Sequence, residues 1–310
     1  IVSPARRQIL IGYALSALGA ALFSTTAIFI KLAYMERTDA ALMLALRMAM
    51  SLPFFITAGL WAVRQRQRAG LALPDGKTLL KAAATGFIGY YISSILDFEG
   101  LTYISAQLER LVLFTYPVFI MILGAAFFGG RLTGSGLIAG AITYAGLGVV
   151  FRSGFIADGQ NVLIGTGLVL GCALTFALYQ LLAKIYINLM GSTLFTAIAL
   201  TSSGLAALVH YAVVSGGFDL SASPRFLMLA AGTAIFATVL PSFFINAGMA
   251  RIGPQSTAMI STISPLITIY LAVALLGETF TFADFIGSLL VIGGIGYYSL
   301  GDMRQRARQS

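Results

Sequence analysis

The sequence is poor in charge, in cysteine and in histidine. Only 10% of its 310 residues are Asp, Glu, Lys or Arg, whereas a soluble domain carries about 25%. Cys172 is the single cysteine, which excludes an internal disulfide, and His210 is the single histidine, which excludes a metal site built from several histidines. These absences exclude a disordered chain, a nucleic-acid-binding domain and an ordinary cytosolic enzyme. We expect neither a metal nor a cofactor.

Apolar residues are abundant instead, at 58% of the chain with a mean hydropathy of +0.92. A helix needs about 20 apolar residues to cross a hydrocarbon core of about 30 Å, and a backbone exposed to lipid must satisfy its own hydrogen bonds. We therefore predict an all-α polytopic membrane protein. Its ten transmembrane helices are expected near residues 9–33, 40–63, 79–98, 102–128, 133–151, 162–187, 193–214, 225–247, 252–276 and 281–300.

Basic residues are divided unequally between the two ends of these helices. With a cytoplasmic N-terminus, the inner side holds thirteen, namely Arg6, Arg7, Arg64, Arg66, Arg68, Lys77, Lys81, Arg131, Lys184, Arg251, Arg304, Arg306 and Arg308. The outer side holds four, namely Lys31, Arg37, Arg152 and Arg225. The positive-inside rule then predicts that both termini are cytoplasmic. The apolar run up to Ile30 is too long for a signal peptide, so it is predicted to be a permanent span. We expect a multi-pass protein of a bacterial inner membrane.

The second half of the chain repeats features of the first. Gly100 and Pro117 recur as Gly248 and Pro265, each 148 residues later, and Gly146 recurs as Gly294. Two five-helix repeats are expected over 1–153 and 160–301, followed by a basic cytoplasmic tail at 302–310. Because five is odd, the second repeat would be inverted in the membrane, as in many secondary transporters. The pattern favours a transporter over a duplication that merely builds a stable bundle.

Two segments carry a resemblance to a known family. The first reads Gly100-Leu-Thr-Tyr-Ile-Ser-Ala-Gln-Leu-Glu109-Arg110, followed by Leu-Val-Leu-Phe-Thr-Tyr116-Pro117, and the second reads Leu276-Gly277-Glu278-Thr279-Phe280. These segments resemble the EamA-type repeats of the drug/metabolite transporter superfamily. The sequence departs from the repeat at residues 129–131, where Gly-Gly-Arg stands in place of Gly-Glu-Thr. The resemblance implies a ten-helix carrier that alternates between inward-open and outward-open states, and bacterial members include exporters of aromatic and other amino acids.

Charged residues inside the predicted spans are costly and therefore informative. Arg47 and Glu109 each lie about eight residues into a helix, or about 12 Å below the outer surface. We predict that they form an ion pair, which either locks the first half or holds a substrate carboxylate, an amine or a proton. Arg110 is predicted to point elsewhere, because neighbours on a helix do not share a face. Asp97 and Glu99 are expected at the outer end of the third helix.

Prolines and aromatic residues indicate where a substrate would bind. Pro117 and Pro265 are expected to kink two equivalent helices, either around a central cavity or as static bends, because each removes a backbone hydrogen bond. A small zwitterion with a bulky side chain would suit a mostly apolar cavity with a few polar groups. The predicted substrate-binding residues are Tyr116, Phe176, Tyr179, Tyr91, Phe114, Phe243, Asn246 and Ser264.

The sequence thus favours a non-enzymatic secondary transporter that exports amino acids or related small metabolites. Two alternatives stay open, namely a membrane-embedded enzyme that uses Asp97 and Glu99 at the outer interface, and a non-transporting receptor or scaffold. The absence of any long loop argues against both. The expected partners are a small-molecule substrate and the lipid bilayer, with the chain as a monomer or a weak homodimer. The pattern does not decide between proton antiport, exchange and passive facilitation.

Overall fold

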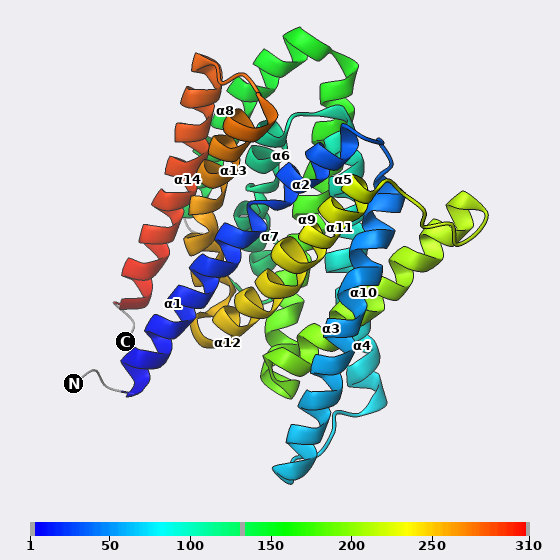
Figure 1. The fold of residues 1–310 in the computed structure, drawn as a ribbon. Helices are drawn as coiled ribbons and strands as arrows, with labels where there is room; N and C mark the ends of the chain where they lie inside the picture. Colours follow the sequence, from blue (N-terminus) through cyan, green and yellow to red (C-terminus); the bar gives the residue numbers. More distant parts are fainter. Residues whose placement is uncertain (1–3, 131–133, 308–310) are drawn as a thin grey trace.

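The computed structural model describes residues 4–130 and 134–307, and every regular element within these ranges is a helix (Figure 1). The first repeat contains α1 (Pro4–Phe23), α2 (Thr26–Tyr34), α3 (Ala40–Arg68), α4 (Gly76–Gly86), the π-helical segment η1 (Phe87–Ile92), α5 (Ser93–Tyr103), α6 (Ala106–Leu113), α7 (Tyr116–Phe127) and α8 (Gly134–Asp158). The predicted all-α class is confirmed for the described residues.

The second repeat has a similar order of elements. It contains α9 (Gln160–Met190), α10 (Ser192–Ser215), α11 (Pro224–Ala234), the π-helical segment η2 (Ile235–Val239), α12 (Leu240–Ile260), the 3₁₀ turn η3 (Ser261–Ile263), α13 (Ser264–Leu271), the π-helical segment η4 (Ala272–Leu276) and α14 (Phe282–Ala307). The start of α1 and the end of α14 lie at the same end of the bundle (Figure 1).

Seven helical stretches among the described residues are long and apolar enough to cross a membrane. They are Arg7–Tyr34, Ala40–Arg68, Gly76–Tyr103, Ala106–Phe127, Gln160–Met190, Ser192–Ser215 and Pro224–Pro254. Three shorter apolar helices, Gly136–Arg152, Ser264–Leu276 and Phe282–Tyr297, lie where the fifth, ninth and tenth spans are predicted. The structure therefore supports a multi-pass helical protein, while the count of ten crossings stays a prediction.

Two of the apolar stretches are interrupted near their middle, and a third break precedes the shorter apolar helix Ser264–Leu276. Residues 24 and 25 separate α1 from α2, residues 114 and 115 separate α6 from α7, and η3 separates α12 from α13. Pro117 and Pro265 each stand in the first turn of the helix that follows a break. A proline is tolerated there because the first turn has no intrahelical use for its missing N–H. The prolines thus mark helix breaks and not smooth bends.

The π-helical segments η1 and η2 follow the sequence repeat. Phe87 begins η1 and Ile235 begins η2, 148 residues later, which is the offset that relates Gly100 to Gly248. A π-helical turn inserts an extra residue into the helix and is frequent at functional sites. The repeat therefore extends from sequence to an uncommon feature of the backbone.

Glycine pairs bring the two repeats into close contact. A β-carbon built on Gly100 of α5 would lie 3.2 Å from the carbonyl oxygen of Gly165 of α9, and one built on Gly248 of α12 would lie 3.0 Å from that of Gly12 of α1. Gly100 and Gly248 are repeat equivalents. The same kind of contact between the repeats is therefore made twice, and small residues permit it because they let helix backbones approach closely.

The buried core is divided over the whole bundle. One cluster surrounds α3 with Leu42, Met43 and Met48, and another joins α6 to α9 through Val112 and Val169. The buried charged residues of the bundle described next belong to α3, α5 and α6. They are held by packed helices and not by loops.

Candidate functional site

Two small cavities lie between the repeats in the described part of the chain. The first, called here the charged cavity, is lined by residues that include Arg47, Tyr90, Ser93, Asp97 and Cys172. The second, called the aromatic cavity, is lined by residues that include Arg110, Phe114, Tyr116, Gln180, Ser261 and Ser264. Each has a volume of about 20 Å³, which is enough for one water molecule. Phe23, Leu113 and Phe176 line both cavities and therefore form the wall between them.

A larger hollow of about 650 Å³ opens on the surface between α3, α4 and α10. Its lining includes Phe55, Leu60 and Leu205 and contains no charged side chain. Among the described residues, the buried Arg47, Asp97 and Arg110 line the two small cavities instead. We therefore place the candidate site at the cavities.

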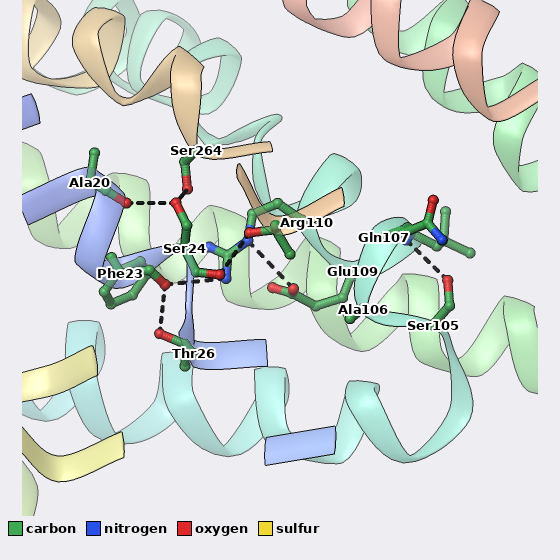
Figure 2. Close-up of polar contacts among 12 residues, drawn as sticks. Ala20, Phe23, Ser24, Thr26, Ser105, Ala106, Gln107, Glu109, Arg110 and Ser264 are labelled. Atoms are coloured by element: carbon green, nitrogen blue, oxygen red, sulfur yellow. Dashed lines mark hydrogen bonds and ion pairs between the residues drawn. The ribbon is translucent and has the colours of Figure 1, made fainter. Parts of the chain in front are cut away.

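The break between α1 and α2 leaves backbone carbonyls that need donors. The carbonyl oxygen of Phe23 accepts hydrogen bonds from Arg110 Nη2 at 3.4 Å and Thr26 Oγ1 at 2.7 Å. The carbonyl oxygen of Ser24 accepts one from Thr268 Oγ1 of α13 at 2.8 Å. The Ser24 hydroxyl donates to the carbonyl oxygen of Ala20 at 2.7 Å and also contacts the Ser264 hydroxyl at 2.7 Å (Figure 2). Side chains from α6 and α13 thus complete the interrupted helix.

Arg110 is the most central of the buried cations. Figure 2 shows its side chain reaching toward the break, between the Glu109 carboxylate and the carbonyl of Phe23. Its Nε lies 3.7 Å from Glu109 Oε2, and its guanidinium carbon lies 5.7 Å from the centre of the Phe23 ring. Both Arg110 and Glu109 are buried. A discontinuous helix whose carbonyl end faces a buried cation is typical of transporter binding sites.

The ion pair of Glu109 is therefore with Arg110 and not, as the depth argument predicted, with Arg47. The guanidinium carbon of Arg47 lies 5.0 Å from the centre of the Phe98 ring, and Arg47 lines the charged cavity together with Asp97. The reason for the difference is side-chain length. Adjacent residues begin on different sides of a helix, but an arginine has a long flexible stem and can reach back to a neighbouring carboxylate.

Asp97 also lies deeper than the sequence indicated. The predicted third span ended at residue 98, which placed Asp97 at the membrane surface, but α5 continues to Tyr103. Asp97 is therefore six residues from the helix end, or about 9 Å, and only 7% of its surface is exposed. Its carboxyl group lies within hydrogen-bonding reach of Glu109. Arg47, Asp97, Glu109 and Arg110 are called the charged cluster below.

Four of the predicted substrate-binding residues meet at one place. Phe114, Tyr116, Phe176 and Ser264 all line the aromatic cavity. The Tyr116 ring meets Phe176 edge to face at 5.3 Å between ring centres and Phe114 at 5.6 Å. Such pairs are the favoured geometry for aromatic side chains. Pro117 directly follows Tyr116 and helps to position its ring through the start of α7.

The other four lie outside the residues that line the two cavities. Tyr179 and Asn246 bond to each other, with Asn246 Nδ2 donating to Tyr179 Oη at 3.0 Å and to Thr196 Oγ1 at 2.9 Å. Tyr91 faces His210 at 5.8 Å between ring centres, and Phe243 faces Phe55 at 5.6 Å. The neighbour of Tyr91, Tyr90, lines the charged cavity instead.

Each end of the site is bridged by a polar contact between the repeats. Glu278, which follows η4, accepts hydrogen bonds from the backbone N–H groups of Ala106 at 2.7 Å and Gln107 at 3.1 Å, at the start of α6. Free N–H groups at a helix start favour such a carboxylate. At the other end of the bundle, Arg251 Nε donates to Gln8 Oε1 at 3.1 Å. The repeats are therefore linked by polar contacts at opposite ends of the bundle.

Sequence reasoning misplaced Asp97 and Arg110, and it missed Gln180 and the donors Thr26 and Thr268 at the helix break. Asp97 was misplaced because the helix boundary was drawn five residues too early, at 98 instead of 103. For Arg110 a signal existed, since a second cation next to Glu109 in an apolar span is costly and needs a partner. The donors at the break gave no signal, because serine and threonine are common in membrane helices.

An all-helical bundle with two repeats, interrupted helices and charged cavities at its centre defines a membrane transporter. A family model described as the EamA-like transporter family matches residues 10–152 and 163–300, and the chain belongs to this family. The resemblance stated from the sequence motifs is thereby confirmed.

Relatives and a solved structure agree with this assignment. The chain is 28% identical over 299 residues to the "Uncharacterized transporter YcbK" of Bacillus subtilis (strain 168), which covers 91% of this chain and 92% of the relative. It is 24% identical over 217 residues to the "Uncharacterized transporter YetK" of the same organism, covering 67% of this chain and 64% of that one. A solved crystal structure aligns over 96% of this chain and 98% of its own with a TM-score of 0.65 and 17% identity, which shows a shared fold.

Proposed function

We propose that this transporter exports amino acids, with a preference for aromatic or hydrophobic side chains, or closely related small metabolites. The observation that carries the proposal is the pairing of Arg110 with the ring cluster Phe114, Tyr116 and Phe176 in one cavity. A guanidinium binds a carboxylate in two-pronged fashion, and aromatic walls favour a bulky apolar side chain. Family membership supports transport and the indicated absence of an enzymatic role.

In the proposed arrangement the chain crosses a bacterial inner membrane ten times as two inverted five-helix repeats, with both termini in the cytoplasm. The paired glycine contacts and the equivalent π-helical segments support the relation between the repeats. The excess of basic residues on one side supports the orientation. Two inverted repeats of one pattern have two packings of similar energy, open to opposite sides.

The two cavities must join to hold a substrate, since each is about 20 Å³. Movement of the Phe23 and Phe176 rings, which stack at 6.3 Å between ring centres, would join them. The joined space would bring the carboxylate of a zwitterion to Arg110 and its amino group to Asp97. The interrupted helices permit such movement, because each half can tilt without breaking a continuous hydrogen-bond ladder.

Alternating access would break one bridge between the repeats at a time. Loss of the bonds from Glu278 to the start of α6 would open one side, and loss of the contact between Arg251 and Gln8 would open the other. Both bridges are made in the present conformation, which supports an occluded state of the cycle.

Counterflow in proteoliposomes tests this function. The purified protein is reconstituted with a high internal concentration of one unlabelled amino acid, and uptake of the same labelled amino acid is followed. We expect accumulation with phenylalanine and leucine and little with glutamate. The absence of accumulation with every amino acid of the panel would reject the substrate class. Uptake by inside-out membrane vesicles then establishes the export direction.

A further inference from the structure

Two buried carboxyl groups face each other in the charged cluster without a donor between them. Asp97 Oδ1 and both oxygens of Glu109 have no hydrogen-bond partner among the described residues, although the two carboxyl groups lie within hydrogen-bonding reach of each other. Two ionised carboxylates are acceptors only and repel at this distance. One proton between them would supply the missing donor.

The surrounding groups leave this need unmet. Arg110 lies 3.7 Å from Glu109 as an ion pair, but its Nε forms no hydrogen bond within the described chain, and neither does Nε of the buried Arg47. Arg110, from α6, lies near both carboxyl groups, and Arg47, from α3, lies near Asp97. Their charge stabilises an ionised carboxylate, but neither Nε atom provides a donor between the two carboxyl groups.

The other titratable groups near the pair are Lys31, Tyr34, Cys172 and Glu278. Three of them are engaged elsewhere. The Tyr34 hydroxyl donates to the carbonyl oxygen of Phe98 at 2.9 Å, the Cys172 sulfur contacts the Ser93 hydroxyl at 3.1 Å, and the Glu278 carboxylate caps α6. Lys31 contributes a positive charge from α2 but makes no hydrogen bond to the pair within the described residues.

We propose that Asp97 and Glu109 bind a single proton between them, and that the ammonium group of the substrate replaces this proton during transport. Only O–H bonds change: the proton leaves the carboxyl pair for water when the ammonium group arrives, and a proton returns when the substrate leaves. The positive charge next to the pair is then the same in both states. An ammonium group carries the N–H donors that the carboxyl oxygens lack.

This inference rests on the proposed export of an amino acid and adds its energy source. The proton and the ammonium group would bind to the same carboxyl oxygens of Asp97 and Glu109, so the proton-bound and substrate-bound states exclude each other. Mutual exclusion at one site is the requirement for antiport. An inward proton gradient would therefore drive the substrate outward.

Infrared spectroscopy tests the proton site without any substrate. At neutral pH the exposed carboxylates are ionised, so a shared proton on the pair gives a C=O stretch of a protonated carboxyl in the purified wild-type protein. We expect Asp97→Asn and Glu109→Gln each to lose this band, because the amide supplies the donor and the remaining carboxylate stays ionised beside two guanidinium groups. Glu99→Gln is the matched control on the same helix and should keep the band.

The infrared spectra can also contradict the proposal. Absence of the band in the wild-type protein, or its persistence in both Asp97→Asn and Glu109→Gln, would overturn the proposal. If neither variant can be purified as a folded monodisperse protein, the wild-type spectrum across a pH titration still decides. A band that is lost only in Glu99→Gln would place the proton on Glu99 and would also overturn the proposal.

Proteoliposomes loaded with labelled phenylalanine and a pH-sensitive dye test the coupling. A proton gradient directed into the vesicles should accelerate the efflux of phenylalanine from wild-type vesicles. This efflux should be accompanied by entry of protons into the vesicles. Glu99→Gln should retain both effects, and Asp97→Asn should lose both. Wild-type efflux that ignores the gradient would reject antiport, whereas a wild-type protein with the infrared band but no transport of any amino acid would reject only the proposed substrate.

Discussion

At the scale of single residues, Arg110 joins three parts of the site. It contacts the carboxylate of Glu109, the ring of Phe23 and the carbonyl that the helix break leaves free. A planar guanidinium can serve these three partners together, because it has several donors in one plane and a face that stacks on rings. Lysine offers a single point charge and would lose part of this set.

Replacement of Arg110 separates its structural role from its role toward substrate. Arg110→Leu should lower the free energy of unfolding by about 3–5 kcal/mol, because it leaves the Glu109 carboxylate unpaired in the interior. Arg110→Lys should fold and keep much less counterflow. Thermal unfolding in detergent and counterflow in vesicles provide the two measurements.

A double-mutant cycle checks the partner of Arg110. The combination of Arg110→Leu with Glu109→Gln should cost less stability than the sum of the two single changes, since no unpaired charge remains. Arg47→Leu with Glu109→Gln should show a smaller coupling. The reverse ranking would restore the pair that the sequence predicted.

Tyr116 and Tyr91 form a matched pair for testing the aromatic cavity. Tyr116 lines that cavity, whereas Tyr91 packs against His210 and Phe87. Tyr116→Ala should reduce phenylalanine counterflow at least tenfold, a loss of about 1.4 kcal/mol of binding, and Tyr91→Ala should leave it within about twofold of wild type. Equal losses in both, at equal amounts of folded protein, would mean that the pocket lies elsewhere.

At the scale of elements, the interrupted first helix depends on donors from other helices. Residues 23–26 contain neither proline nor glycine, yet the helix stops and restarts there. A carbonyl that leaves its helical bond in an apolar interior needs another donor. Arg110 and Thr268 provide these donors from α6 and α13.

Thr268→Val tests this dependence, because valine has nearly the same shape as threonine but lacks the hydroxyl group. The Ser24 carbonyl would lose the donor at 2.8 Å, and an unsatisfied buried acceptor costs about 1–3 kcal/mol. The melting temperature should therefore fall. Thr57→Val is the control, since the Thr57 hydroxyl is exposed and bonds only to carbonyls of its own helix. A similar fall in the control would show that Thr268 has no special role.

At the scale of the whole molecule, the two repeats are joined by a helix crossing that is made twice, between α12 and α1 and between α5 and α9. Gly248 lies against Gly12 and Ser16, and a β-carbon built on Gly248 would overlap the Ser16 hydroxyl oxygen and lie 3.0 Å from the Gly12 carbonyl oxygen. A helix is a rigid unit, so a larger residue at this crossing must separate α12 from α1. Any movement of one repeat against the other must therefore change the packing at such crossings.

Gly248→Val should therefore destabilise the protein by about 1–3 kcal/mol through overpacking. Gly167→Val is the matched control, because a β-carbon at that helical glycine meets nothing within 4 Å. The fraction of monodisperse protein after heating, measured by size-exclusion chromatography, gives the comparison. Equal loss in the control would show that helix propensity and not the crossing is responsible.

The orientation of the molecule is tested with reporters at the C-terminus. We expect a fluorophore that matures only in the cytoplasm to be bright there and a phosphatase that works only in the periplasm to be inactive. The reason is the excess of thirteen basic residues over four on the predicted inner side. An active phosphatase fusion would reverse the predicted topology.

The sequence by itself determined the all-helical membrane class, the two repeats and the family. These depend on hydropathy and on the spacing of glycine and proline. Both are properties of the sequence that do not depend on how the helices pack. It also predicted that Tyr116, Phe114, Phe176 and Ser264 share one site, and these four residues line one cavity. Three of them lie at helix breaks marked by Pro117 and Pro265, which are visible in the sequence.

Only the tertiary structure decided which charges meet and where the first helix breaks. Asp97 faces Glu109 because α5 continues five residues beyond the predicted boundary of 98, to 103, and Arg110 reaches Glu109 because a long side chain can cross to a neighbouring face. The break at residues 24 and 25 exists because Thr268, 244 residues away from Ser24, donates to its carbonyl. Contacts at such separations are set by packing and by the need to satisfy buried polar groups, which local sequence patterns do not encode.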